Sequence, residues 1–193
     1  MIRFYSELFG PYPFDTYGIA LIPDVPGGLE TQGLAIVGVP FPSLLAHELA
    51  HQWFGNHVSI VDWKETWLNE GLVTYATWLW SEHSGDTTVA ETASTGYDLM
   101  SETQLPPPGD PSATDVFNQS VYVRGALTIH ALRTAIGDDR LFTLIQEWID
   151  RYGGTSASTE DFIALAEEVS ETDLGDLFDG WLNQPTMPPL PGN

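Results

Sequence analysis

Residues 47–51 read His-Glu-Leu-Ala-His, which places two imidazoles and a carboxylate within little more than one helical turn. Side chains four positions apart in a helix are turned by about 40° and separated by about 6 Å along the axis, so His47 and His51 can reach one ion. Glu48 falls on the same side, where it can take a proton from a water molecule. This pattern indicates a catalytic zinc site.

Two histidines do not complete such a site, which needs a third protein ligand and an open position for water. His57 is one candidate, because it stands ten residues after His47, the offset that metzincins use. Metzincins also have a glycine seven residues after the first histidine, where the chain turns back to the metal. Phe54 occupies that place here and the glycine comes one residue later, at Gly55, which argues against His57.

Glu70 is the second candidate for the third ligand. It follows His51 with 18 residues between them and stands near the start of another expected helix. If that helix packs on the one carrying His47, its carboxylate completes a site of two histidines and one glutamate. The adjacent Gly71 would let the backbones approach closely. We therefore expect Glu70 to be the ligand.

The elements that must position these residues are mainly helical after residue 43. Short, β-branched apolar runs flanked by glycine and proline predict strands over 17–22 and 33–38, which would form a small sheet. Proline-rich stretches predict a loop over 105–111 and an extended segment over 184–191. Helical periodicity predicts helices over 43–55, 66–83, 88–102, 119–136, 139–152, 159–169 and 173–183.

Composition excludes several classes of protein. The chain has 193 residues, of which 42% are apolar, enough for one globular domain. Its formal charge of −21 would repel nucleic acid and anionic membranes, so neither is an expected partner. It has no cysteine, which excludes disulfides and thiolate ligands. We find no transmembrane span and no signal-peptide pattern in the sequence, which favours the cytoplasm.

The segments around the predicted zinc ligands resemble the aminopeptidase N family of gluzincin metallopeptidases, which has the same 18-residue spacing. Other segments are similar to that family's motifs for recognising a substrate amine and stabilising an oxyanion, and to the end of its catalytic domain. The resemblance implies an α+β protein with the thermolysin-like zinc peptidase fold, mainly helical with a small N-terminal sheet. The similar segments are His47–Asn56, Trp67–Gly71, Gly27–Glu30, Tyr122–Ala126 and Gly180–Pro185.

The resemblance also implies roles for individual residues. One Zn²⁺ per chain would be held by His47, His51 and Glu70, with Glu48 as the general base. Tyr122 would donate a hydrogen bond to the oxyanion that develops during amide hydrolysis. These assignments make the chain a hydrolase and a metalloprotease.

A further segment matches the family's exopeptidase motif, and it would bind the substrate's free amino group. Glu30 would pair with the α-ammonium group, and Gly28 and Leu29 would belong to the same substrate-binding segment. The sequence departs from the family's Met-Glu-Asn form around Glu30, which leaves the role of the missing asparagine unassigned. His47 follows Glu30 by only 17 positions, which predicts a shortened loop beside the cleft.

We interpret residues 1–193 as a single gluzincin catalytic domain. Residues 1–40 would hold the small sheet and the amine-recognition segment, 41–185 the helical zinc-binding part, and 186–193 a tail. The resemblance leads us to expect no counterpart of the family's β-rich N-terminal domain within these residues. The chain would then be either a fragment or a minimal form, and further domains of a longer chain would be its partners.

The expected activity is release of N-terminal amino acids from peptides with a free amino terminus. A zinc endopeptidase with an open cleft is the nearest alternative, because an unroofed site would accept longer substrates. A catalytically silent peptide-binding fragment is a second alternative, but all four of His47, Glu48, His51 and Glu70 are present. Epoxide hydrolysis, which the family includes, is a third.

Overall fold

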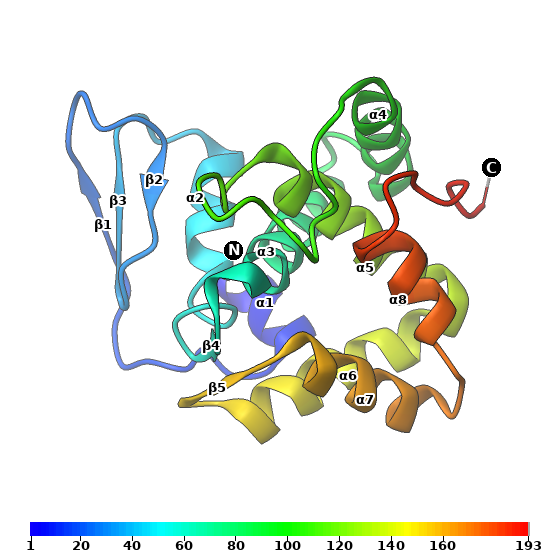
Figure 1. Cartoon of the computed structure of the whole chain (residues 1–193). Helices are drawn as coiled ribbons and strands as arrows, with labels where there is room; N and C mark the ends of the chain where they lie inside the picture. The colour runs from blue at the N-terminus through cyan, green and yellow to red at the C-terminus, as the bar shows by residue number, and fades with distance from the viewer. Residues whose placement is uncertain (193) are drawn as a thin grey trace.

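Helix α2 stands between a small sheet and a larger helical body in the computed structural model, which describes residues 1–192 (Figure 1). Most of the predicted helices are confirmed within a few residues at each end. The helices are α1 (Ile2–Phe9), α2 (Pro42–Ala50), α3 (Thr66–Ser84), α4 (Val89–Glu102), α5 (Gly125–Ile136), α6 (Asp138–Tyr152), α7 (Thr159–Ser170) and α8 (Gly175–Leu182), with short helical turns η1 (Trp63–Glu65) and η2 (Ser120–Arg124).

The small sheet contains the two predicted strands and one that was not predicted. Strand β1 (Gly18–Leu21) pairs in parallel with β3 (Leu34–Val37), and β2 (Gly28–Leu29) pairs antiparallel with the other side of β3. Because β2 has two residues, its sequence carries no alternation that could reveal it. Its position matters, since it carries the predicted amine-recognition segment.

A second pair of strands lies at the edge of the helical body. Strand β4 (Val58–Ile60) pairs in parallel with β5 (Thr155–Ala157), although the two are far apart in the sequence. Neither strand was predicted, because each is only three residues long and its pairing depends on the tertiary fold.

The helix that carries the two histidines is shorter than predicted. It begins with Pro42 in its first turn, where the missing N–H of proline costs nothing, and ends at Ala50 rather than at residue 55. After it the chain turns at Gly55, whose φ of 116° is a conformation that favours glycine, and enters β4. The turn begins within the predicted helix, so the extension to residue 55 was wrong.

Two glycines bring α3 and α5 together at backbone distance. A Cβ added at Gly71 would lie 2.8 Å from the carbonyl carbon of Gly125, and one added at Gly125 would lie 3.0 Å from the Cα of Gly71. Gly71 thus allows a close approach of two backbones, as expected. Its partner, however, is the start of α5, whereas we expected the helix that carries His47. This crossing places η2 beside α3, and its Tyr122 beside His47 of α2.

The core is rich in aromatic side chains, and α1 contributes to it. Tyr5 and Phe9 from this helix pack edge-on against the buried ring of Trp53, at centroid distances of 6.1 and 6.2 Å. The Tyr5 hydroxyl donates to the carbonyl of Ala76 in α3 at 3.0 Å, which satisfies its polar group inside the core. Helix α1 was not predicted, because its eight residues carry no side-chain cap.

After α8 the chain runs on without helix or strand through residues 183–192, as predicted for the 184–191 segment, which overlaps the expected 186–193 tail. Residue 193 of that predicted tail lies outside the described residues. Within residues 1–192, no helix combines the length and apolar character needed to cross a membrane.

Candidate metal centre and active site

Helices α2 and α3 bring the three predicted zinc ligands together. The Nε2 atoms of His47 and His51 lie 3.3 Å apart, and each is 3.4 Å from Oε2 of Glu70. Ligand atoms about 2.0–2.1 Å from a tetrahedral zinc ion lie about 3.3–3.4 Å from one another. The triangle of donor atoms therefore has the size that one zinc ion requires.

Two further observations favour a metal ion at this triangle. Oε2 of Glu70 is buried and accepts no hydrogen bond from the described part of the chain, an arrangement that is costly unless a cation faces it. Nδ1 of His51 lies 3.1 Å from the carbonyl oxygen of Phe54, which suits an Nδ1–H donor and leaves Nε2 free to bind a metal. The donor set thus fits zinc.

His57, the alternative third ligand, lies elsewhere. Its ring packs edge-on against Phe14 at 6.1 Å, and a Cβ added at Gly153 would come within 2.3 Å of its Nε2 atom. It belongs to neither group of side chains in residues 1–192 that could share a metal ion.

The predicted base, Glu48, is buried beside the ligands, with only 3% of its surface exposed. Burial raises the pKa of its carboxyl group to about 7; His51 opposes that rise, whereas Glu30 and Glu70 add to it. Oε2 of Glu48 has no hydrogen-bond donor among the described residues, so it is free to accept a proton from water. A carboxylate with a pKa near neutrality suits a general base.

The predicted amine-recognition segment lies directly against this base. A Cβ added at Gly28 would sit 2.1 Å from Oε1 of Glu48, so only a glycine permits the observed approach. Carboxylate oxygens of Glu30 and Glu48 and a ring nitrogen of His51 all lie within 4.8 Å of one another. The side chain of Leu29 is half exposed and does not line the cleft.

Two amide side chains that follow the zinc-ligand helix hold this segment in place. Asn56 donates from Nδ2 to the backbone carbonyl of Glu30 at 2.6 Å. The buried Gln52 accepts from the backbone N–H of Gly33 at 2.8 Å. Both amides stand in the segment that resembles the peptidase family, but the sequence alone assigned neither of them a role.

Tyr122 reaches the site from η2, and its ring stacks against that of His47 with centroids 6.2 Å apart. Burial raises the pKa of its phenol above the ordinary value, and the negative charges of Glu70, Glu30 and Glu48 raise it further. The hydroxyl therefore keeps its proton near neutral pH and can act as a hydrogen-bond donor.

These side chains face a surface cleft with a volume of about 480 Å³. A second hollow of about 380 Å³ shares Glu30, His51 and Glu70 with this cleft, and the exposed rings of Trp63 and Phe117 also line it. The cleft residues are Pro26, Gly27, Gly28, Glu30, Ser43, Leu44, His47, Glu48, His51, Glu70, Thr77 and Tyr122.

A mainly helical domain with His-Glu-x-x-His at the end of one helix, and a glutamate from another helix beside both histidines, is typical of zinc metallopeptidases of the gluzincin class. A model of the Peptidase family M1 domain matches residues 1–181. The chain belongs to peptidase family M1.

Individual relatives agree with this assignment. The chain is 30% identical to Aminopeptidase M1-C of Oryza sativa subsp. japonica, a match covering 97% of this chain and 24% of the relative. It is also 30% identical to Aminopeptidase B of Mus musculus, covering 95% of this chain and 33% of that protein. The chain thus spans about a quarter of the length of the first of these relatives and a third of the second.

Solved structures show the same fold. The M1 zinc metallopeptidase from Deinococcus radiodurans matches with a TM-score of 0.92 and 35% identity, over 98% of this chain and 44% of that one. A mutant of this enzyme has been crystallised bound to a Tyr-Ser-Ala substrate. The native leukotriene A4 hydrolase of Saccharomyces cerevisiae matches in fold alone, with a TM-score of 0.79 and 23% identity over 98% of this chain and 35% of that one.

Proposed function

We propose that this chain is an aminopeptidase that binds one zinc ion and releases the first amino acid from peptides with a free amino terminus. The observation that carries the proposal is the position of Glu30, a carboxylate held within 4.8 Å of the predicted base and of a predicted zinc ligand. A peptide whose α-ammonium group pairs with Glu30 would present only its first peptide bond to the metal centre.

His47, His51 and Glu70 would hold the zinc ion, which when bound supplies Lewis-acid chemistry for amide hydrolysis. Glu48 takes a proton from the attacking water and passes it to the leaving nitrogen.

Tyr122 and Glu30 orient the substrate around this chemistry. The Tyr122 phenol donates a hydrogen bond to the substrate's carbonyl oxygen as negative charge develops on it. Glu30 accepts a hydrogen bond from the α-ammonium group, which fixes the distance between the amino terminus and the scissile bond. The tripeptide bound by the Deinococcus radiodurans relative supports peptides as the substrate class. The greater length of the relatives supports further domains as partners.

The test is hydrolysis of amino-acid amides and of their N-acetylated forms, with and without added zinc. Free-amine substrates should be cleaved, and acetylated ones hardly at all, because acetylation removes the charge that Glu30 binds. Glu30→Ala should slow cleavage of the free-amine substrates and reduce the difference in rate between them and the acetylated substrates. Glu48→Gln is the matched inactive control, with turnover lower by roughly 10²–10⁴.

The same screen separates the alternatives. Internal cleavage of blocked peptides at the rate of free ones would make the chain an endopeptidase in this form. Binding of peptides without turnover in the presence of zinc would make it a silent binding fragment.

A further inference from the structure

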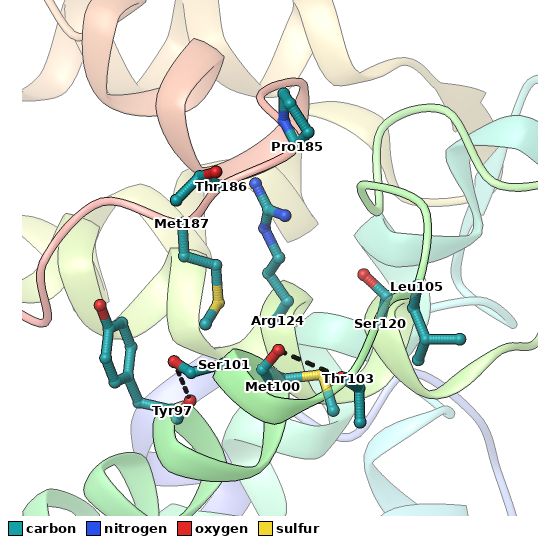
Figure 2. Close-up of a pocket in the computed structure, with 10 residues that line it drawn as sticks. All are labelled: Tyr97, Met100, Ser101, Thr103, Leu105, Ser120, Arg124, Pro185, Thr186 and Met187. Atoms are coloured by element: carbon teal, nitrogen blue, oxygen red, sulfur yellow. Dashed lines mark hydrogen bonds between the residues drawn. The ribbon is translucent and has the colours of Figure 1, made fainter.

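Arg124, at the end of η2, is the feature from which we infer a further role. Only 4% of its surface is exposed. Its Nε donates to the carbonyl of Trp181 at 2.7 Å, and its Nη2 donates to the carbonyls of Gly180 and Gln184 at 3.1 and 2.6 Å. Figure 2 shows the side chain extending from its helix toward Pro185 and Thr186.

The guanidinium binds the C-terminal end of α8 rather than an acidic side chain. No carboxylate in residues 1–192 forms an ion pair with Arg124. The last carbonyls of a helix have no partners within it and carry partial negative charge, so a cation there is stabilised. Arg124 thus fastens its own turn to a segment 56–60 residues further along the chain.

The other side of this turn is fastened to the helix that carries Glu70. Gly125, directly after Arg124, meets Gly71 at backbone distance, and Gly71 directly follows Glu70. The turn itself is π-helical, a geometry that is rare and often found at functional sites. Tyr122 therefore stands on a short irregular turn that is held from α3 and from α8.

We propose that Arg124 is a positioning residue for Tyr122. By tying the π-helical turn to the end of α8, it fixes the Tyr122 phenol at the cleft beside His47. This inference rests on the proposed role of Tyr122 as the oxyanion donor. It makes residues 180–184, which do not line the cleft, a structural support of the catalytic step.

The principal variant is Arg124→Met, which keeps a long apolar stem but cannot donate to the three carbonyls. Without this anchor the phenol loses its fixed position, and a misplacement of about 1 Å can cost about 10²-fold in rate. We expect kcat to fall by roughly 10-fold or more, while KM and zinc content change less than about twofold. Arg124→Lys keeps the charge and part of the donor set, so it should restore most of kcat.

Arg133→Met is the matched control, because this arginine lies in α5 but binds Asp138 and the Tyr75 hydroxyl away from the cleft. It should lose stability without losing kcat. The decisive measurement is the double variant with Tyr122→Phe. If Arg124 acts through the phenol, Arg124→Met should lower kcat by less than about twofold once that hydroxyl is gone.

A second measurement needs no activity. 3-Fluorotyrosine incorporated at position 122 alone should give one narrow ¹⁹F resonance, which Arg124→Met shifts or broadens and Arg133→Met leaves unchanged. The inference would be overturned if Arg124→Met changed neither kcat nor the ¹⁹F resonance. It would also be overturned if kcat of the double variant fell by the product of the two single-variant losses. Normal kcat in Tyr122→Phe would instead remove Tyr122 from the proposed mechanism, and the resonance would still show whether Arg124 fixes the ring.

Discussion

At the scale of single residues, position 28 requires a glycine because the side chain of Glu48 leaves no room there for a Cβ atom. Gly28 does not have a positive φ, so the restriction is steric: an added Cβ would lie 2.1 Å from a carboxylate oxygen. We predict that Gly28→Ala displaces Glu48 and lowers turnover by roughly 10², while zinc stays bound. Gly175→Ala is the control, because its Cβ would meet only an ordinary contact at 3.4 Å. Steady-state rates and metal analysis of both variants check this, and normal turnover in Gly28→Ala would contradict it.

Glu48 also makes stability depend on pH. Burial raises its pKa from the ordinary 4.5 to about 7, so the metal-free folded chain holds this proton more tightly than the unfolded chain does. The contribution of this proton to the free energy of unfolding is fully present below about pH 4.5 and is lost as the pH rises through 7. Glu48→Gln stays neutral at every pH, so its free energy of unfolding should exceed that of the parent by roughly 3 kcal/mol at pH 8 and match it near pH 4.

Denaturant unfolding of both proteins in a chelator measures the difference. An equal gap at both pH values would show that the carboxyl group of Glu48 does not carry this proton in the folded chain.

The choice between Glu70 and His57 is the third question at this scale. If Glu70 is the third ligand, Glu70→Ala should weaken zinc binding severely, whereas His57→Ala should leave the metal content at the proposed one zinc per chain. Metal analysis after dialysis against a weak chelator distinguishes the two. Retained zinc in Glu70→Ala together with lost zinc in His57→Ala would make His57 the ligand.

At the scale of elements, the sequence predicts what is periodic and local. His47 lies in α2, His51 caps the C-terminal end of the same helix and Glu70 lies in α3, so helical spacing alone could place all three on facing surfaces. Strands β2, β4 and β5 could not be predicted, because two or three residues show no period and pairing between residues 58 and 155 is a property of the tertiary fold.

The rest of the candidate site depends on contacts between elements. The approach of Gly28 to Glu48 depends on how the small sheet docks on α2, which no spacing reveals. The π-helical form of η2 lies hidden inside a longer helical pattern, so the turn carrying Tyr122 was predicted as ordinary helix. The family resemblance supplied Tyr122 and Glu30, but not the amides that hold the recognition segment.

A substitution at Asn56 tests how far the position of the Glu30 segment depends on the segment that follows α2. It joins the segment after α2 to the backbone of Glu30, so Asn56→Ala should loosen the carboxylate that we propose binds the amine, without altering the proposed metal ligands. Loss of one such hydrogen bond is worth about 1 kcal/mol, so we predict that KM for free-amine substrates rises about fivefold. The preference over acetylated substrates should shrink, with zinc content unchanged.

Gln146→Ala is the control for this prediction. It also removes an amide that donates to a backbone carbonyl, that of Leu8, but far from the cleft. A KM that stays constant in Asn56→Ala would show that Gln52 alone holds the segment.

At the scale of the whole molecule, the net charge of −21 surrounds a cleft whose proposed ligand is a cation. Such a field attracts positively charged peptides and repels negative ones, in addition to the local contact with Glu30. We predict that kcat/KM at low salt decreases in the order Leu-Lys-Lys, Leu-Ala-Ala, Leu-Glu-Glu for peptides that share the same first residue. Because all three present the same amine and the same first side chain, the order reports on the field beyond the first bond.

Salt separates this long-range effect from contacts inside the cleft. The distance over which charges are screened falls from about 30 Å at 0.01 M salt to about 3 Å at 1 M, so the differences among the three peptides should nearly vanish at the higher concentration. Cleavage of Leu-Ala-Ala should change least, because its amino and carboxyl termini leave this peptide without a net charge on which the field could act. If the ratio of kcat/KM for Leu-Lys-Lys to that for Leu-Glu-Glu did not depend on salt, short-range contacts with the residues that line the cleft would explain the discrimination. The overall charge would then have no part in substrate selection.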